Sequence, residues 1–488
     1  MNRFHSIFAS IAIIFCVALA GCGGNNQFGS QQQNNGNSSV VLAMTDSPPT
    51  AVSILSAKVT LTGATLNGAM PSPGNVSLFS GSTTVELTRL QTDIAYITTA
   101  TNIPAGNFTS VTLTFANPSL TIENDTASTI GTCASASICT MAPTTTANLS
   151  TTLPLSNFTA ASSAPVGLLV DVNLDKLLSL TLGADFSAGT SVTSFIPGSN
   201  AAPPAGAPPV GAEDVVGHVQ NINAANSTFT LTNALGSYSL KATSGSAFFQ
   251  FPNSASCLTQ AFSCLQNNQI LSVDIGIQPD GSIVARNILF EDADSSDVEV
   301  EGMVTGTNAA LQQFNFVVLA ESSPVTGLTI GMPVTAQYST SLPTPFDVDF
   351  IHADNQQIST SSFNLSFTGP VDLVPGQQVS IRRNSSSGSI LLADRVRLRS
   401  SRVTAPVLSV GLPNITLAGL PFLFSGHGGV TTIIAQTSAN PPTIFYSTTI
   451  PISASTNIVN LPVSVRGPLF NTGGTNRTLI ATKVVLQP

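Results

Sequence analysis

The chain has 488 residues, of which 42% are hydrophobic and 8% are charged, and its formal net charge is -9. About 25% of residues are charged in a typical soluble protein, so this composition excludes a charge-rich disordered chain and a coiled coil. It also excludes a basic nucleic-acid-binding protein, because the net negative charge would repel phosphate. At roughly 150 residues per domain, the length predicts about three domains.

Residues 1–21 have the pattern of a lipoprotein signal peptide. Arg3 precedes an apolar run from Ile7 to Leu19, which is shorter than the ~20 residues that span a bilayer. The run ends in Leu19-Ala20-Gly21-Cys22, which resembles the bacterial lipobox. That resemblance implies cleavage before Cys22 and attachment of diacylglycerol and an acyl chain such as palmitate to Cys22. The alternative is an ordinary signal peptide that happens to end near a cysteine.

The residues after the cleavage site predict a tether. Residues 22–39 contain no charge and one apolar side chain, Phe28, so they cannot bury enough surface to fold. Gly23 follows the lipidated cysteine, which by analogy with bacterial lipoproteins favours the outer membrane. We therefore expect a lipid-anchored protein of the bacterial cell envelope, with the membrane as its first partner.

The four cysteines beyond Cys22 form two close pairs in sequence. Cys133 and Cys139 lie in one Ser- and Thr-rich stretch, and Cys257 and Cys264 lie in another. An exported chain meets an oxidising compartment, so each pair is predicted to form a local disulfide. A metal site or a redox pair is the alternative, but neither pair has Cys-x-x-Cys spacing.

Beyond the tether, apolar and polar residues alternate in short runs. Examples are Val111-Thr112-Leu113-Thr114-Phe115 and Phe229-Thr230-Leu231-Thr232, with Gly, Pro and Asn between the runs. This period of two is typical of half-buried strands, and long amphipathic helix patterns are lacking. The sequence predicts an all-β protein, with residues 174–182 open to either helix or strand.

A Pro-, Gly- and Ala-rich segment, 198–212, is predicted to be a linker between an N-terminal domain at 40–197 and a C-terminal half. The C-terminal half is repetitive. Gly281–Ile288 is similar to Gly388–Val396 and, more weakly, to Thr478–Val484. We expect three β-modules at 213–295, 296–400 and 401–488. The alternative is the strand-turn-strand similarity that any β-protein shows.

Two family resemblances support this division. Residues 40–197 resemble the bacterial domain of unknown function 4382, and the segment after residue 213 resembles domain of unknown function 5666, a small β-barrel module. The motifs of the first are Leu42–Pro48, Val85–Leu90, Ile103–Phe108, Leu169–Leu174 and Phe195–Pro197. The resemblance implies an N-terminal β-sandwich, then a tandem of small β-barrel-like modules, in the cell envelope. It implies no reaction and no cofactor.

Enzyme signatures are scarce. The processed chain keeps three histidines, which lie in three different predicted modules: His218, His352 and His427. Gly426-His427-Gly428-Gly429 is similar to a hydrolase oxyanion loop, but the chain contains no Gly-x-Ser-x-Gly nucleophile motif. Paired carboxylates for glycoside cleavage need no local motif, so a hydrolase remains the third hypothesis.

One acidic segment is a weak calcium candidate. Asp171, Asn173 and Asp175 place three oxygen ligands at a spacing of two, so they would share one face of a strand. The segment is not an EF-hand loop, because Lys176 stands where that loop needs Gly. A solvated strand face is the simpler interpretation.

Two charge clusters flank the second predicted module. Six acids lie between Glu291 and Glu301, and six arginines lie between Arg382 and Arg402. Arg395, Arg397 and Arg399 alternate, so they share a strand face that is a candidate anion site. We slightly favour that free face for an acidic ligand. The alternatives are a face that discourages edge pairing and pairing of the arginines with the acidic cluster.

These observations favour a non-catalytic cell-envelope lipoprotein that presents β-modules for adhesion or scaffolding. The second hypothesis is a surface lipoprotein that binds glycan or acidic polysaccharide, although the chain has no Trp and only 4 Tyr for sugar stacking. Expected partners are the membrane and an envelope polysaccharide or protein, and neither a cofactor nor nucleic acid is expected.

Overall fold

The computed structural model describes most of the chain beyond the predicted anchor. The described residues are 37–47, 53–68, 73–145, 149–162, 164–177, 183–197, 211–243, 247–252, 257–293, 298–322, 328–340, 343–349, 351–353, 356–359, 363–387, 390–447 and 452–486. The predicted signal peptide and Cys22 lie outside them, as does most of the predicted linker. Residues Asn34–Pro488 form one compact unit.

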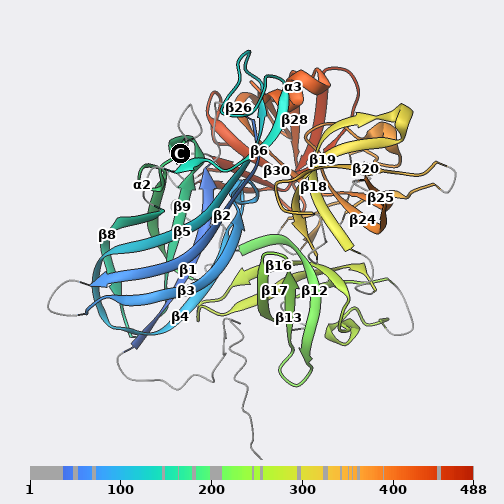
Figure 1. Cartoon of the computed structure of the whole chain (residues 1–488). Coiled ribbons are helices and arrows are strands. Elements are labelled where there is room, and N and C mark those ends of the chain that lie inside the picture. Colours follow the sequence, from blue (N-terminus) through green and yellow to red (C-terminus); the bar gives the residue numbers. More distant parts are fainter. Residues whose placement is uncertain are drawn as a thin grey trace, which may run out of the picture. The chain divides into compact units, whose positions relative to one another are not determined.

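The N-terminal domain contains two main sheets, with strand orders β11-β9-β1-β4 and β3-β2-β5-β6, where β8 also pairs with β5 (Figure 1). Its elements are β1 (Asn37–Ser47), β2 (Ser53–Gly68), β3 (Val76–Glu86), η1 (Leu87–Gln91), β4 (Ala95–Pro104), β5 (Gly106–Asn124), β6 (Ser137–Met141), β7 (Thr144–Thr145), β8 (Ser150–Ala160), β9 (Val166–Asn173), α1 (Leu174–Leu177), β10 (Gly183–Ala184), α2 (Phe186–Gly189) and β11 (Thr190–Phe195).

The alternation seen in the sequence explains this sandwich. On β5, Val111, Leu113 and Phe115 are buried in the domain core, and the residues between them are more exposed. Phe115 stacks on Phe186 with 4.6 Å between ring centroids. The prediction of an all-β fold is confirmed. In the stretch left open between helix and strand, residues 174–177 form the short helix α1.

Each of the next three segments forms one main sheet. Module 1 contains β12 (Gly211–Asn223), β13 (Thr228–Asn233), β14 (Gly236–Lys241), β15 (Phe248–Gln250), η2 (Phe262–Cys264), β16 (Ile270–Ile277) and β17 (Ile283–Asp292). Module 2 contains β18 (Val298–Asn308), η3 (Ala309–Leu311), β19 (Gln313–Glu321), β20 (Pro333–Gln337), β21 (Phe346–Val348), β22 (His352–Ala353), β23 (Gln356–Gln357), η5 (Pro370–Asp372), β24 (Gln378–Ser387) and β25 (Ile390–Leu398).

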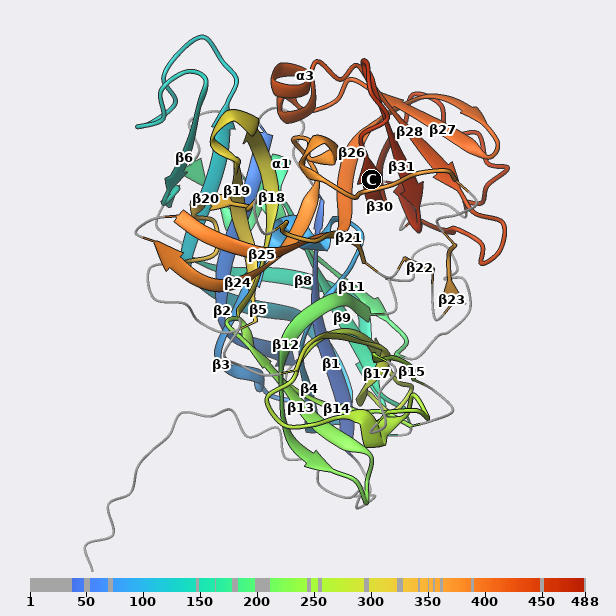
Figure 2. The ribbon, with the colours of Figure 1, turned by 90° about the vertical axis from the view of Figure 1, so that its right-hand side faces the viewer.

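Module 3 contains β26 (Ser400–Gly411), β27 (Asn414–Ala418), α3 (Phe422–Gly428), β28 (Thr432–Thr437), β29 (Ile444–Ser447), β30 (Pro462–Phe470), β31 (Asn476–Ala481) and β32 (Lys483–Leu486) (Figure 2). Among the described residues, no helix is both long and apolar enough to cross a bilayer.

All three modules contain the same closed ring of five strands. In module 1 the ring runs β14-β13-β12-β16-β17, and a parallel pairing of β14 with β17 closes it. Module 2 repeats it with a parallel closure of β20 on β25. Module 3 repeats it with β28 parallel to β31. In each module the first three ring strands form an antiparallel meander. The fourth strand then pairs with the first, and the fifth strand pairs with the fourth and the third. This is the strand order of the OB fold, a five-stranded Greek-key barrel.

Two predicted boundaries differ from the structure. Asn37 and Ser38, expected in the tether, pair with β4, because β1 begins before the first apolar run. Gly211 and Ala212, expected in the linker, pair with β16. In both places backbone hydrogen bonding extends a strand into residues whose side chains carry no strand signal.

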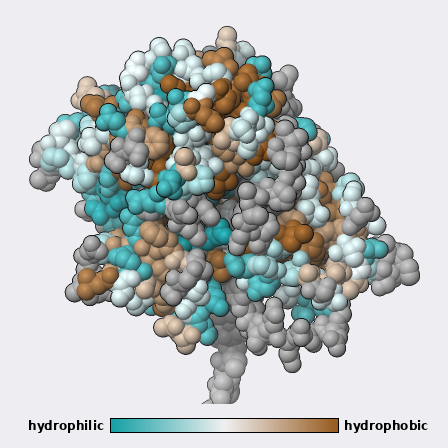
Figure 3. Space-filling view, turned by 180° about the vertical axis from the view of Figure 1, so that it is seen from behind, coloured by the Kyte–Doolittle hydropathy of each residue, from teal (hydrophilic) through white to brown (hydrophobic). Residues whose placement is uncertain are grey.

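The exposed surface reflects the scarcity of charge. Figure 3 shows one face on which pale residues of intermediate hydropathy are common between the teal and brown ones. The most exposed large apolar side chains are far apart in sequence and include Ile196, Leu258 and Val371. Charged side chains are instead concentrated inside the molecule, where the modules meet.

Candidate functional site: a buried charge cluster at the module junctions

Backbone hydrogen bonds show that the modules match residue by residue. Val219, Val304 and Val407 occupy one position on the first ring strand of each module. The amide of each donates to a carbonyl just before the fourth ring strand, in Gln269, Gln377 and Leu461, respectively. The carbonyl of each accepts from the preceding residue, which is Asn268, Gly376 and Asn460, respectively. This shared geometry aligns the first and fourth ring strands of the three modules.

Three positions of each module carry polar or charged side chains that lie together on neighbouring strands. We call each set of three a junction triad. The triads are Asp214, Asp274 and Asn287 in module 1, Glu299, Arg382 and Arg395 in module 2, and Arg402, Arg466 and Lys483 in module 3. In module 1 the Asn287 amide donates to Asp274 at 2.6 Å.

The triads of modules 1 and 3 pair with each other. The Arg466 guanidinium donates to the Asp214 carboxylate and forms an ion pair with Glu213. The Lys483 ammonium lies 2.7 Å from Glu213. Arg466 is 1% exposed and Lys483 is 5% exposed, so these are interior pairs and not surface pairs.

The sandwich contributes the loop that follows β3. Asp93 forms ion pairs with Arg402 and, at 2.9 Å, with Lys483. Arg89 reaches the other way, to Glu301 at 2.8 Å and to the backbone carbonyl of Asp214. One loop of the N-terminal domain therefore contacts charged residues of all three modules.

Module 2 is joined to module 1 through Glu291. Its carboxylate lies 3.2 Å from Arg395, 2.6 Å from Arg397 and 2.6 Å from Arg399. Arg399 is 1% exposed and also forms an ion pair with Asp349 at 2.6 Å. The favoured expectation of a free anion-binding face is therefore wrong for Arg395, Arg397 and Arg399. These arginines are paired with the acidic cluster. Sequence alternation places them on one strand face but does not say what covers that face, and in the structure the neighbouring module covers it.

Together these residues form the junction cluster. Its cations are Arg89, Arg382, Arg395, Arg397, Arg399, Arg402, Arg466 and Lys483. Its carboxylates are Asp93, Glu213, Asp214, Asp274, Glu291, Asp292, Glu299, Glu301, Asp347, Asp349 and Asp394. Eight of the fifteen Lys and Arg of the chain lie in this cluster, and five of these eight are buried.

Carboxylates outnumber cations in the junction cluster, and the pKa values respond accordingly. Burial raises the pKa of Glu299 to about 7, and burial raises the pKa of Asp349 to about 6. Neighbouring cations keep the pKa values of Glu291 and Asp93 below their usual range, although burial opposes them. At Glu299 and Asp349, burial therefore outweighs the neighbouring cations, which would lower these pKa values.

The two predicted disulfides are confirmed. Cys133 and Cys139 are bonded with 5.6 Å between their Cα atoms, and Cys257 and Cys264 with 5.0 Å. Each closes a short loop, one in the sandwich and one between the third and fourth ring strands of module 1. Neither lies at the junction cluster.

The calcium candidates are not brought together as a site. Asp171 lies on β9 opposite Thr45 of β1, and the Asn173 carboxamide accepts from the Lys176 amide at the start of α1. The side chain of Asp175 lies outside the described residues. Within the part of the chain that the structure describes, no group of three His, Cys, Asp or Glu is placed to hold a metal ion.

The three histidines are separate in the structure as well. His218 is buried on β12, and burial lowers its pKa. The His427 ring, at the end of α3, contacts the Glu123 carboxylate of β5. The side chain of His352 lies outside the described residues. The Gly-rich segment around His427 thus forms the end of a helix beside the sandwich.

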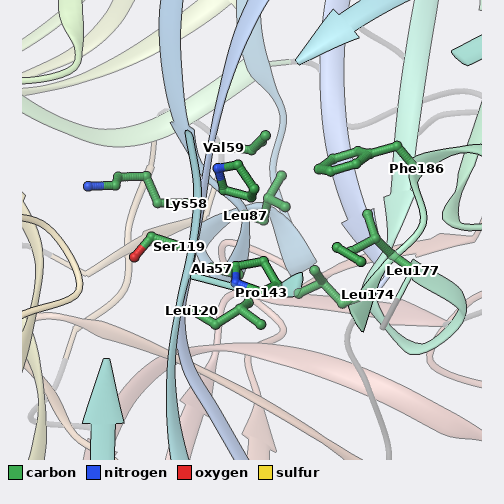
Figure 4. A pocket seen from close by; sticks show the side chains of 12 residues that line it. Ala57, Lys58, Val59, Leu87, Ser119, Leu120, Pro143, Leu174, Leu177 and Phe186 are labelled. Atoms are coloured by element: carbon green, nitrogen blue, oxygen red, sulfur yellow. The ribbon is translucent and has the colours of Figure 1, made fainter. Parts of the chain in front are cut away.

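A small recess lies inside the sandwich and not at the junction. It holds about 10 Å³, close to the least space that one water molecule needs. Its lining is apolar, with Leu87, Leu174 and Phe186 around it, while Lys58 and Ser119 point away (Figure 4). This recess has no convergent polar groups of the kind that orient a substrate.

Comparison with known proteins yields little. No family model and no curated protein matches the chain. A solved multidomain protein with nucleic acid binding domains from Streptococcus pneumoniae is 10% identical, with 56% of this chain and 73% of that chain covered. The TM-score is 0.10, so this likeness carries no argument.

Sequence reasoning found only part of the junction cluster. The segments containing Glu291 and Arg395 stood out as local runs of charge. Asp93 and Arg466 were missed, because each is an isolated charge among neutral residues, and Asp214 was missed because Glu213 is its one charged neighbour. The signal that would have found them is the scarcity of charge itself. In a chain with 8% charged residues, a charged side chain inside an otherwise apolar strand is unusual.

Proposed function

We propose that this protein is a lipid-anchored, non-catalytic lipoprotein of the bacterial cell envelope that acts as a rigid scaffold or adhesion body. The observation that carries the proposal is the junction cluster. Ion pairs join each module to the sandwich or to another module, so the cluster fixes orientation between parts. Buried ion pairs are poor sources of net stability, but they select one arrangement over others.

The lipid anchor rests on the sequence around Cys22. A lipidated Cys22 followed by a short uncharged tether would hold this rigid body close to the outer membrane. Metabolic labelling with an alkyne fatty acid tests the anchor directly. We expect labelling of the wild type and none of Cys22→Ala. Equal labelling of the two would exclude lipidation at Cys22.

Rigidity is tested by hydrogen exchange on the purified Cys22→Ala chain. If the body is a scaffold, amides of β12, β18 and β26 at the junctions will exchange as slowly as those of the sandwich core strand β5. Urea unfolding followed by the same amides will show one shared transition. Separate transitions for the sandwich and the modules would contradict the proposal.

Catalysis is tested on the same protein with panels of glycoside, ester and peptide substrates. The proposal predicts no turnover above that of a heat-denatured control. Substrate turnover that saturates and co-purifies with the chain would favour the hydrolase hypothesis instead.

A further inference from the structure

Arg477 differs from the arginines of the junction cluster. It lies at the start of β31 and is 6% exposed, yet no carboxylate of the described residues lies within ion-pair distance of it. Burial lowers its pKa, and no neighbouring acid opposes that effect. A buried cation without a counter-ion is costly, and in this protein the other strongly buried cations have carboxylate partners.

The hydrogen bonds of Arg477 leave donors unused. Its Nη1 donates to two backbone carbonyls, of Gly474 at 3.1 Å and of Asn476 at 2.8 Å. Its Nε is enclosed and has no partner. Its Nη2 has no described protein partner and is not enclosed, so it is the end of the side chain that a ligand can reach.

The loop beside the guanidinium is small and open. Residues 472–475 are exposed, and Gly473 and Gly474 have φ values of 80° and 62°, which favour glycine. Glycine leaves the backbone uncovered by side chains next to the Arg477 head group. The Thr475 carbonyl is held by the Thr431 amide at 2.8 Å, which ties this loop to the strand beside it.

We propose that Arg477 and the loop 471–475 form a binding site for one oxyanion group, which supplies the counter-ion that the protein lacks there. The guanidinium is permanently charged, and its Nη2 can donate a charge-assisted hydrogen bond to a phosphate or a carboxylate, which is the chemistry shared by free phosphate and acidic polysaccharide. This site is distinct from the predicted face at Arg395, Arg397 and Arg399.

The test compares melting of the full chain in phosphate and in chloride at equal ionic strength. Bound phosphate should raise the melting temperature of the wild type by about 2–4 °C. Arg477→Gln should lose that rise, whereas Lys241→Gln, which removes one exposed charge of β14, should keep it. A rise of equal size in Arg477→Gln, or no rise in the wild type, would overturn the proposal.

A second measurement covers the case in which Arg477→Gln does not fold. Arg477→Lys keeps the charge but lacks the Nη2 donor, so it should show a weakened rise. In the wild type, the ¹⁵N Nε resonance assigned to Arg477 should shift on phosphate titration. An unshifted Nε resonance at saturating phosphate would overturn the proposal.

The source of the oxyanion is separated by two further titrations. Trigalacturonate tests the acidic polysaccharide, and a neutral trisaccharide is its control. Binding of trigalacturonate at least tenfold tighter than phosphate would assign the site to a glycan. Equal affinity would assign it to a free anion, and a shift with the neutral sugar that persists in Arg477→Gln would contradict an oxyanion site.

Discussion

Modules 1 and 3 have the same five-stranded ring, yet their junction triads carry opposite charge. Module 1 places Asp214 and Asp274 where module 3 places Arg402 and Arg466. The third position is Asn287 in one and Lys483 in the other. Two copies that met through this face would repel if both triads carried charge of the same sign. The difference teaches that opposite net charge at three corresponding positions makes two faces of one fold complementary.

Module 2 is intermediate, with Glu299 beside Arg382 and Arg395. The Arg395–Glu299 pair partly neutralises the triad within module 2. Arg395 also contacts Glu291 of module 1. The three modules therefore differ in net triad charge. That order of charges matches the pairing in the structure, where modules 1 and 3 meet through opposite charges.

The largest effect is expected from Arg466→Met, which removes the positive side of the module 1–module 3 contact. Asp214 and Glu213 would lose a buried partner, and breaking such a pair costs about 3–5 kcal/mol. Urea unfolding of the Cys22→Ala chain measures the change. Lys241→Met, an exposed substitution, is the control and should change stability by less than about 0.5 kcal/mol. A cost below about 1 kcal/mol for Arg466→Met would contradict an interior role.

A double-mutant cycle sharpens the comparison between the two modules. We expect Asp214→Asn and Arg466→Met to be less destabilising together than the sum of the single changes, with a coupling of about 1–3 kcal/mol. The reason is that each single change leaves a buried charge without its partner, and the double change removes both charges. Additive effects would show that the two side chains do not interact in solution.

A pH series addresses module 2. Glu299 has a pKa of about 7 in the folded state, above the ordinary value near 4.5. Between these two pH values the folded state therefore binds more protons than the unfolded state. Stability should therefore fall by about 1–3 kcal/mol as the pH rises from 5 to 8, and Glu299→Gln should flatten that slope. Thermal unfolding across this range is the measurement. Stability that increases with pH in this window would reverse the assignment.

The lowered pKa values of Glu291 and Asp93 affect folding stability at the acidic end of the pH range. Their contribution to folding stability is complete at pH values above the ordinary pKa range of carboxylates. It is lost as the pH falls through the lowered pKa values of the folded state. Maximum stability is therefore expected at mildly acidic pH, between the two windows.

The smallest effect is expected at the contact between module 3 and the sandwich that lies outside the junction cluster. The His427 side chain is 40% exposed, so solvent reaches its contact with the Glu123 carboxylate from the histidine side. His427→Gln should change stability by about 0–1 kcal/mol, as exposed pairs do. A loss as large as that of Arg466→Met would show that this contact, too, behaves as an interior one.

The sequence by itself determined the class of fold and the local elements. Alternation at Val111–Phe115 predicts a half-buried strand because side-chain direction alternates along any extended backbone. The spacing of Cys133 and Cys139 predicts a local disulfide because six residues can close a tight loop. Repeated short motifs predicted repeated modules, since each repeat must build the same sheet. All of these depend on neighbours within the chain.

Only the tertiary structure decided which charges meet. Arg399 and Glu291 are 108 residues apart, and Arg466 and Asp214 are 252 residues apart. The same alternation that places Arg395, Arg397 and Arg399 on one face is compatible with solvent, a ligand or another module on that face. Ion pairing depends on a distance of a few ångströms in three dimensions, and no local pattern encodes the packing of one barrel on the next. For that reason the sequence marked the arginines, while the fold assigned their partners.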